Sequence, residues 1–331
     1  MKFGAVALKD AFGAVLAHSV ALDTGRLRKG RVLSEADIAL LRAEGRDTVT
    51  VARLEPGDVA EDRAAERLAQ ALVPDPERAG LRLGKAATGR VNIHATGPGV
   101  VEVLADRIHA LNALHPMITV ATVPQWQRIE ARGMVATVKI IAYAVPEAAL
   151  EAACLAGQSA LRLRSPQANT ADLIQTSTDA AENGDKGHAV TRARLERLGV
   201  ELGDKQIVPH DTDRLAAAIR ASTADAILIL TASATSDLHD VAPEALRAAG
   251  GTVVHFGMPV DPGNLLFFGH LGARPVIGLP GCARSPALNG ADWVMERLLC
   301  GVPVRPGDIA AMGVGGLLKE IPQRGRLREA G

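Results

Sequence analysis

Short apolar runs alternate with segments of helical periodicity through the second half of the chain. We expect the apolar runs to form strands at residues 172–175, 205–208, 226–230, 252–256 and 275–277. Helices are expected between them, at about residues 187–198, 213–221, 243–249 and 286–299. This spacing is typical of an α/β domain, so the sequence predicts three layers around a mostly parallel sheet. Ligands bind such sheets outside the carboxyl ends of the strands.

The first half of the chain has a different rhythm, in which strands outnumber helices. Strand-like runs lie at residues 3–8, 48–54, 89–94, 118–123 and 134–143, and a helix is expected near residues 101–114. Ser34 and Asp37 have capping-box spacing, which predicts a helix that ends at Gly45. Asp58 with Glu61 is interpreted as the cap of the next helix, and a pair of site carboxylates is the alternative. A smaller α+β region therefore precedes the α/β domain.

These patterns divide the chain into four predicted parts. Residues 1–75 form an N-terminal α+β segment, and residues 76–165 form a small α+β subdomain that follows a break rich in Pro, Arg and Gly. Residues 166–302 form the α/β domain. Residues 303–331 form a tail rich in Gly, Pro and Arg, a composition typical of a linker or an interaction tail.

Composition narrows the class of function. Lys+Arg and Asp+Glu are equal at 37 each, and only 2% of residues are aromatic, so neither nucleic acid nor an anionic membrane surface is an expected partner. No apolar run approaches the roughly 18 residues that a membrane span needs, and the first residues lack the apolar core of a signal peptide. The three cysteines show no C-x-x-C spacing. We therefore expect a cytoplasmic protein.

A loop dense in hydroxyl groups follows the expected strand 226–230. It contains Thr231, Ser233, Thr235 and Asp237, and a helix is expected soon after it. Hydroxyls and free main-chain N–H groups at a strand-to-helix turn favour a phosphate. A capping loop without a ligand is the alternative. Asp240 adds a carboxylate that suits either a cation or the helix cap.

The loop after the expected strand 172–175 is polar as well. It begins with Thr176 and leads to Asp185, for which Mg²⁺ ligation and helix capping are both open. Asp211 or Thr212 is expected to cap the following helix, and the neighbouring His210 is a candidate general base.

Two Pro-Gly turns follow the last two expected strands. The first contains Pro262, Gly263 and Asn264, and the second contains Pro280, Gly281 and Ser285. Proline fixes one backbone dihedral and glycine allows a close approach of the main chain, so together the turns can form a rigid rim around a small molecule.

Some common site patterns are missing. No G-x-G-x-x-G follows a strand, the histidines have no H-E-x-x-H spacing, and residues 80–85 fall short of a P-loop. A dinucleotide oxidoreductase is therefore disfavoured. Cys282 is interpreted as a small residue in a tight turn rather than a nucleophile, because no histidine lies near it in the sequence.

The loops of the second half, in this order, resemble the molybdopterin-binding domain shared by the molybdenum-inserting enzyme and the pterin adenylyltransferase of molybdenum cofactor synthesis. Members carry a Thr-Gly-Gly-x-Ser-x-Gly-x-Asp loop, a Pro-Gly-Lys-Pro turn and a Leu-Pro-Gly-Asn-Pro-x-Ser segment. The matching segments here are residues 231–240, 261–265 and 279–285. The likeness spans roughly residues 170–302, and the first half of the chain is similar to a divergent branch whose members are often fused to a nucleotidyltransferase.

The chain departs from the family pattern at two loops. Ala232-Ser233 stands in place of Gly-Gly, so Cβ atoms disfavour positive φ there. The family's Gly-Asp-Glu-Leu loop matches only Thr178-Asp179-Ala180-Ala181, without its Glu. The family's Asp-Ser-Asn matches Asp185-Lys186-Gly187, which favours a site role for Asp185.

The resemblance implies a ligand, cofactors and site residues. The ligand is molybdopterin or its nucleotide adduct, with Mg²⁺ and molybdate as further requirements of the molybdenum-inserting enzyme. Asp185 and Asp240 would be the catalytic and metal-binding residues. The pterin would be held by a set of loop residues: Thr176, Thr231, Ser233, Thr235, Asp237, Pro262, Gly263, Asn264, Pro280, Gly281 and Ser285.

Three functional hypotheses follow from the resemblance. The first is a molybdopterin molybdenumtransferase, which inserts molybdate and hydrolyses adenylylated molybdopterin. The second is a noncatalytic carrier that presents the cofactor to a molybdenum cofactor nucleotidyltransferase or an apo-molybdoenzyme. The third is a nucleotide-processing hydrolase, since fold alone does not fix function. Related proteins also lead us to expect a homo-oligomer.

Overall fold

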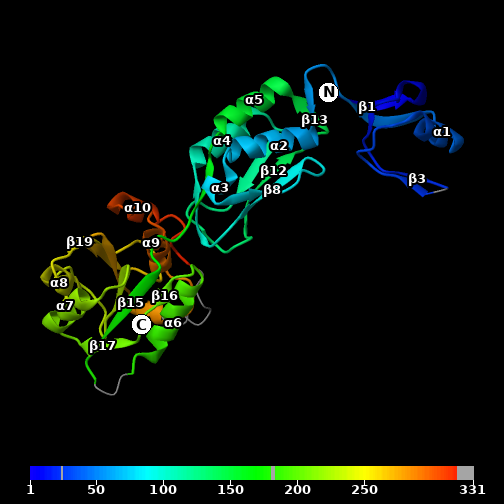
Figure 1. Cartoon of the computed structure of the whole chain (residues 1–331). Coiled ribbons are helices and arrows are strands. Elements are labelled where there is room, and N and C mark those ends of the chain that lie inside the picture. The colour runs from blue at the N-terminus through cyan, green and yellow to red at the C-terminus, as the bar shows by residue number, and fades with distance from the viewer. Residues whose placement is uncertain (24, 180–182, 319–331) are drawn as a thin grey trace, which may run out of the picture. The chain divides into compact units, whose positions relative to one another are not determined.

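The computed structural model describes residues 1–23, 25–179 and 183–318. Contacts divide the chain into two compact units (Figure 1). The N-terminal unit comprises residues 1–97, 101–125 and 131–163, and the C-terminal unit comprises residues 98–100, 126–130 and the chain from residue 164 onward. No helix within the described ranges is long and apolar enough to cross a membrane.

The N-terminal unit is built from small antiparallel sheets and short helices. A three-stranded sheet has the order β1-β5-β2, a four-stranded sheet has the order β10-β12-β8-β7, and β3–β4 and β6–β13 form two-stranded pairs. The strands are β1 (Lys2–Ala7), β2 (Val15–Leu16), β3 (Val20–Leu22), β4 (Gly25–Leu27), β5 (Thr48–Arg53), β6 (Asp58–Ala60), β7 (Leu81–Leu83), β8 (Arg90–Ala95), β10 (Ile118–Thr122), β12 (Met134–Ile140) and β13 (Ala144–Pro146). The helices are η1 (Leu8–Asp10), α1 (Glu35–Ala43), α2 (Glu61–Leu72), α3 (Pro76–Ala79), α4 (Ala105–Leu114) and α5 (Glu147–Ala156).

Two helix starts in this unit test the capping predictions. The capping box of Ser34 and Asp37 is confirmed at the start of α1, and the helix stops before Gly45, whose φ is +72°. The cap at Asp58 is wrong, because Ala60 is the N-cap residue of α2. The Asp58 carboxylate instead accepts a hydrogen bond from the Glu55 amide and lies 2.7 Å from the N-terminal ammonium. A strand, β6, occupies the place where the cap was expected.

The C-terminal unit contains the predicted α/β domain. Its seven-stranded sheet has the order β16-β15-β18-β21-β20-β19, with β17 also paired to β15. The pairs that β15 makes with β16, β17 and β18 are parallel, as is β18–β21, whereas β20 is antiparallel to β21 and β19. The strands are β15 (Thr170–Ser177), β16 (Glu201–Leu202), β17 (Gln206–Pro209), β18 (Ala226–Leu230), β19 (Thr252–Phe256), β20 (Phe267–Leu271) and β21 (Arg274–Leu279).

Helices cover both faces of this sheet, which confirms the three-layer, mostly parallel α/β fold with a smaller α+β region before it. They are α6 (Asp185–Glu196), α7 (Thr212–Ala221), α8 (Val241–Ala248), α9 (Gly290–Leu299) and α10 (Pro306–Ala311), with a short 3₁₀ helix, η2 (Gly281–Arg284). Figure 1 shows α7 and α8 together on one flank of the sheet and α6 on the other. Three further short strands, β9 (Gly99–Val103), β11 (Arg128–Ile129) and β14 (Leu161–Arg164), complete the chain.

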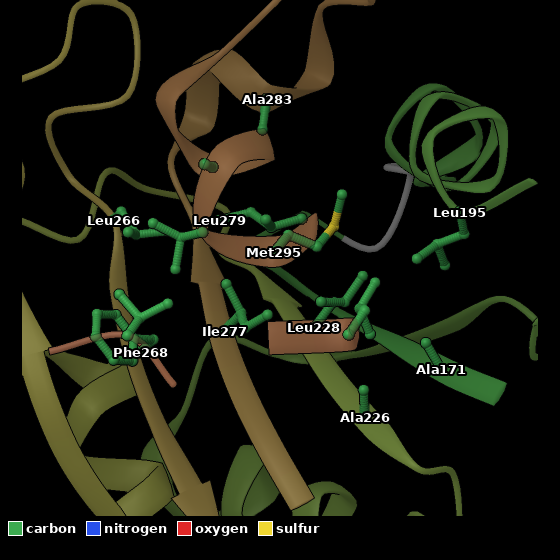
Figure 2. Packing of buried hydrophobic residues seen from close by; sticks show 14 of the residues in the cluster. Ala171, Leu195, Ala226, Leu228, Leu266, Phe268, Ile277, Leu279, Ala283 and Met295 are labelled. Carbon is green, nitrogen blue, oxygen red and sulfur yellow. The ribbon is translucent and has the colours of Figure 1, made fainter. Parts of the chain in front are cut away.

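Alternate residues of the central strands fill two separate cores. Leu228 and Ile277 pack with Leu195 of α6 and Met295 of α9 in one layer, as Figure 2 shows. Ile227 and Ile229 face the other layer, which contains residues of α7 and α8. Because β18 is fully buried on both faces, its sequence is a continuous apolar run, as expected for a central parallel strand.

Part of the predicted tail belongs to the domain. Val304, Ile309 and Met312 are buried in the same core as Leu228, and Asp261 forms a β-bridge with Leu317. The interpretation of this segment as a linker or interaction tail is therefore wrong up to Leu318, because its few apolar side chains are enough to pack it on the domain. Residues 319–331 lie outside the described residues.

Candidate functional site

The loops predicted to bind a ligand all follow strands that end at one edge of the C-terminal sheet. The carboxyl ends of the parallel strands β15, β17, β18 and β21 lie at this edge. Strand β19 is antiparallel to β20, which is antiparallel to β21, so β19 ends there as well. The structure thus places the predicted site residues in loops or helix starts that follow these strands, with one exception. Thr176 lies within β15, because that strand extends to Ser177 and not only to the predicted residue 175.

A chain of hydrogen bonds through His210 joins three of these strand ends. The Thr176 hydroxyl is 2.8 Å from His210 Nδ1, and His210 Nε2 is 3.1 Å from the Ser233 hydroxyl. Thr176 is buried, and its oxygen also accepts a hydrogen bond from the Ala232 amide at 2.9 Å. The imidazole therefore positions the exposed Ser233 hydroxyl at the carboxyl edge of the sheet.

The hydroxyl loop after β18 is closed by its own side chains. Thr231 donates from its hydroxyl to the Ser233 carbonyl at 2.6 Å, and its oxygen is 3.3 Å from the Thr235 hydroxyl. Both threonines are buried, whereas Ser233 and Asp237 are exposed. The Asp237 carboxylate accepts a hydrogen bond from the His239 amide. Within this loop, Ser233 and Asp237 are thus better placed to meet a ligand than the two threonines.

Asp240 caps the helix that follows this loop. It is the N-cap residue of α8, and its two carboxylate oxygens accept hydrogen bonds from the amides of Val241 and Ser236 at 2.7 and 3.1 Å. The sequence predicted that free amides near this helix start would bind a phosphate. In the structure, the Asp240 carboxylate already accepts hydrogen bonds from two of these amides.

Asp185 has a different environment at the start of α6. It is the first helical residue, and Gly184 precedes it as the N-cap, so the capping alternative for Asp185 is wrong. Its side chain is 64% exposed and accepts a hydrogen bond from Lys205 at 2.5 Å. The buried Gln175 amide donates to the Gly184 carbonyl and fixes this helix start against β15. Asp185 is therefore available to solvent, whereas Asp240 is committed to a cap.

A buried arginine fixes the Pro-Gly loop that follows β21. Arg194 of α6 donates from Nε to Asp292 of α9 at 2.5 Å. Its two terminal nitrogens donate to the carbonyls of Ala283, Ser285 and Ala287 at 2.8 to 3.2 Å. One side chain therefore holds the loop between two helices.

This loop also contacts its neighbours at the edge. Arg284 donates to the Thr231 carbonyl at 2.8 Å, which links the loop to the hydroxyl loop after β18. Asn289, the buried N-cap residue of α9, donates to Cys282 Sγ at 3.0 Å. Cys282 thus has a structural contact, in line with its interpretation as a turn residue.

The first Pro-Gly turn packs against the start of the same helix. The Pro262 carbonyl accepts a hydrogen bond from the Gly290 amide at 2.8 Å, and the Asn264 carbonyl accepts one from the Met258 amide at 3.0 Å. Gly263 has a φ of +144°, and a Cβ there would lie 2.9 Å from the Gly290 nitrogen. Glycine is therefore required at residue 263 for both conformation and space.

Burial shifts the pKa of Glu296 and of His188, which lie in the helices behind the edge. It raises the pKa of Glu296 in α9 to about 7, an effect increased by the Asp292 charge and opposed by Arg128 at 3.1 Å. It lowers the pKa of His188 in α6, with a further contribution from Arg192.

Sequence reasoning missed Arg194, Gln175 and Arg284 as organising residues. Arg194 could have been suspected from its position next to Leu195, because one face of this helix must pack against the sheet. His210 was predicted only as a candidate general base, and its bonds to Thr176 and Ser233 were not predicted. Ala180 and Ala181, which match the family's acidic loop, lie outside the described residues. Among the described residues, no group of three His, Cys, Asp or Glu side chains is placed to hold a metal ion.

Several solved structures are similar to the chain at low identity. A crystal structure of molybdenum cofactor biosynthesis protein B is 18% identical, with 41% of this chain and 92% of that chain covered and a TM-score of 0.30. A molybdenum cofactor biosynthesis protein from Pyrococcus furiosus is 14% identical, with coverages of 92% and 66% and a TM-score of 0.26. The molybdopterin biosynthesis MoeA protein from Pyrococcus horikosii is 13% identical, with coverages of 91% and 75% and a TM-score of 0.32. These values are too low to assign a function.

Two family models match separate parts of the chain. Residues 5–53 match a domain of unknown function, and residues 173–299 match the family described as probable molybdopterin binding domain. No curated protein matches the chain. The second match contains all of the predicted site residues and the sheet edge that carries them. The likeness to the molybdopterin-binding domain family is therefore located in the α/β domain, at residues 173–299.

Proposed function

We propose that the chain binds molybdopterin or its nucleotide adduct at the carboxyl edge of the C-terminal sheet. The phosphate or nucleotide end lies at the loop of residues 231–237, and the remainder of the ligand lies between the two Pro-Gly loops. The observation that carries this proposal is the exposed Ser233 hydroxyl, which His210 positions at an edge lined by loops of the matched family. In the tautomer in which His210 Nε2–H donates to this hydroxyl, the serine proton is free to donate to a phosphate oxygen.

Three features of the structure support this binding mode. Ser233 and Asp237 are exposed, so they face solvent, where a ligand would arrive. Arg284 lies beside the hydroxyl loop and supplies positive charge next to an anionic ligand. The Pro280 to Ser285 loop is held by Arg194, so its position does not depend on the ligand. A fixed wall and an adaptable hydroxyl loop suit a small polyanionic molecule.

The Asp185 carboxylate could provide one protein ligand to a magnesium ion that is bound jointly with ligand phosphates. Magnesium commonly takes one or two protein carboxylates and completes its coordination with water and phosphate oxygens. Asp185 offers an exposed carboxylate, and among the described residues Lys205 is the only one whose side chain contacts it. Asp240 offers a carboxylate that already caps a helix. A bound Mg²⁺ would act as a Lewis acid on phosphoryl oxygens. Of the two carboxylates, Asp185 needs less rearrangement to bind it.

Molybdate insertion coupled to hydrolysis of adenylylated molybdopterin is the second candidate function. The exposed Asp185 favours it, because a carboxylate in that position can ligate Mg²⁺ or orient water. Molybdate would be a substrate of this reaction. The carrier hypothesis requires binding alone, and the cofactor would then pass to a nucleotidyltransferase or an apo-molybdoenzyme.

One assay separates these candidates. The purified chain is incubated with adenylylated molybdopterin, Mg²⁺ and molybdate, and both AMP release and bound pterin are measured in the same samples. AMP release that requires molybdate and is lost in Asp185→Ala would establish insertion. Pterin binding without AMP release would establish a carrier.

Two further outcomes of this assay reject the proposal. Nucleotide turnover without any pterin binding would favour the hydrolase hypothesis. Neither binding nor turnover would reject molybdopterin as the ligand. Glu201→Gln serves as a matched carboxylate control, because Glu201 is exposed at the start of β16.

A further inference from the structure

The N-terminal unit contains a cavity that the proposed function does not use. Its volume is about 350 Å³, which lies within the range of roughly 300–1,000 Å³ typical of small-molecule sites. Its walls come from the end of α2, the start of α3, the end of β9 and the turn between α5 and β14. All of its lining residues belong to the N-terminal unit.

The cavity is formed before any ligand arrives, because backbone hydrogen bonds join its walls. The Ser159 amide donates to the Ala71 carbonyl at 2.9 Å, and the Leu104 amide donates to the Ala160 carbonyl at 2.9 Å. Arg107 also donates to the Gln158 carbonyl in the same turn. A preformed cavity avoids part of the ordering cost of binding.

The charged groups of the wall differ in what they already bind. Asp75 accepts a hydrogen bond from the Arg78 amide at 3.0 Å, and Glu102 has an interaction of its own. Within residues 1–23, 25–179 and 183–318, the guanidinium groups of Arg78 and Arg162 have neither a hydrogen-bond nor an ion-pair partner. The lining therefore offers two free cations, while its acids are engaged.

Most of the remaining lining is apolar, and it includes one residue in a strained backbone conformation. Val73, Leu104 and Leu161 contribute hydrocarbon surface. Ser159 has a φ of +54°, a conformation that a serine adopts at a cost. The surrounding hydrogen bonds hold this residue in place.

We propose that this cavity is a second ligand site, which binds a small anion with an apolar body through Arg78 and Arg162. Guanidinium groups pair with phosphate or carboxylate oxygens in a bidentate geometry, and the apolar wall packs against the body of the ligand. Phosphate and carboxylate share this chemistry, so the test compares the two.

The test is calorimetric titration of the full chain with phenyl phosphate and, separately, with benzoate. Saturable binding of one or both is expected, weakened at least tenfold in Arg162→Gln and in Arg78→Gln. Arg82→Gln is the matched control, because Arg82 is exposed on the nearby strand β7 and does not line the cavity. Binding should be unchanged in that control.

The C-terminal loops are a competing location for phenyl phosphate, so Ser233→Ala is titrated in parallel. Binding that survives Ser233→Ala and is lost in Arg162→Gln supports the cavity. Binding that is unaffected by both arginine changes, or the absence of saturable binding of either probe, overturns the proposal. Circular dichroism of each variant verifies that the exposed substitutions leave the fold intact.

Discussion

The loop after β21 and the loop after β18 end at the same edge of the same sheet, yet different bonds hold them. A buried guanidinium, that of Arg194, fixes the first loop through three carbonyls and a carboxylate. Small hydroxyls and the half-buried His210 hold the second. Hydroxyl hydrogen bonds can be exchanged for bonds to a ligand phosphate, whereas the buried ion pair cannot be exposed without a large cost. We therefore propose that the first loop is a fixed wall and that the second loop responds to the ligand.

Removal of the buried arginine should have the largest effect on stability. Arg194→Met keeps most of the side-chain volume but leaves Asp292 buried without its cation. We expect a loss of about 3–5 kcal/mol in the free energy of unfolding, measured by urea denaturation. Arg214→Met, an exposed arginine on α7, should change it by less than about 0.5 kcal/mol. A loss below about 1 kcal/mol for Arg194→Met would mean that the wall is held by other contacts.

The same helix that carries Asp292 should make stability depend on pH. Glu296 has a pKa raised to about 7 in the folded chain against 4.5 for an unperturbed glutamate, so the folded state binds more protons between these values. The stabilisation is present below about pH 4.5 and is lost as pH rises through about 7, by up to about 3 kcal/mol. Denaturation of Glu296→Gln across this range should show a flatter profile than the parent chain. Identical profiles would refute the shifted pKa, and Glu201→Gln is the exposed control.

Substitutions of Asp240 can separate its role as the N-cap of α8 from a role in ligand binding. Asp240→Ala should destabilise α8 by about 1 kcal/mol, because the amides of Val241 and Ser236 lose their acceptor. Asp240→Asn retains a good N-cap and should restore most of that stability. If Asp240→Asn lowers the Mg²⁺ dependence of ligand binding while it preserves stability, the carboxylate has a second role. Equal behaviour of the chain and the Asn variant would limit Asp240 to the cap.

Asp185 should have the smallest effect on stability and a larger one on the ligand. Its ion pair with Lys205 is solvent-exposed, so Asp185→Ala should cost less than about 0.5 kcal/mol in urea denaturation. Its loss should nevertheless weaken the Mg²⁺-dependent part of molybdopterin binding, measured by titration with and without EDTA. Unchanged binding under both conditions would exclude Asp185 from the site.

The alternating apolar runs were enough to predict the fold of the C-terminal domain. Strands such as β18 are buried on both faces, and their sequences show it. Strand β20 was missed because it closely follows a Pro-Gly turn, whose residues were interpreted as a loop. The packing of Ile309 and Met312 was missed because two apolar side chains in a Gly-rich segment give no periodic signal.

The candidate site was only partly predictable. Loop residues could be assigned to the correct edge, since each follows a strand and parallel strands end together. Pairings between distant residues could not be predicted, such as Arg194 with Asp292, or His210 with Thr176 and Ser233. These pairs are 98, 34 and 23 residues apart in the chain, and only tertiary structure brings them together. The distinction between Asp185 and Asp240 also required the helix starts themselves.

We propose that the hydroxyl loop, positioned by His210, binds molybdopterin. The most direct test of this binding is the dissociation constant of molybdopterin, measured for four chains. These are the parent chain, Ser233→Ala, His210→Asn and the control Ser165→Ala, an exposed serine in the loop before β15. We expect Ser233→Ala and His210→Asn to bind molybdopterin about tenfold to a hundredfold more weakly, because each loses a hydrogen bond that serves a charged ligand group. The control Ser165→Ala should bind as the parent chain does. Equal affinity of all four chains would contradict the account.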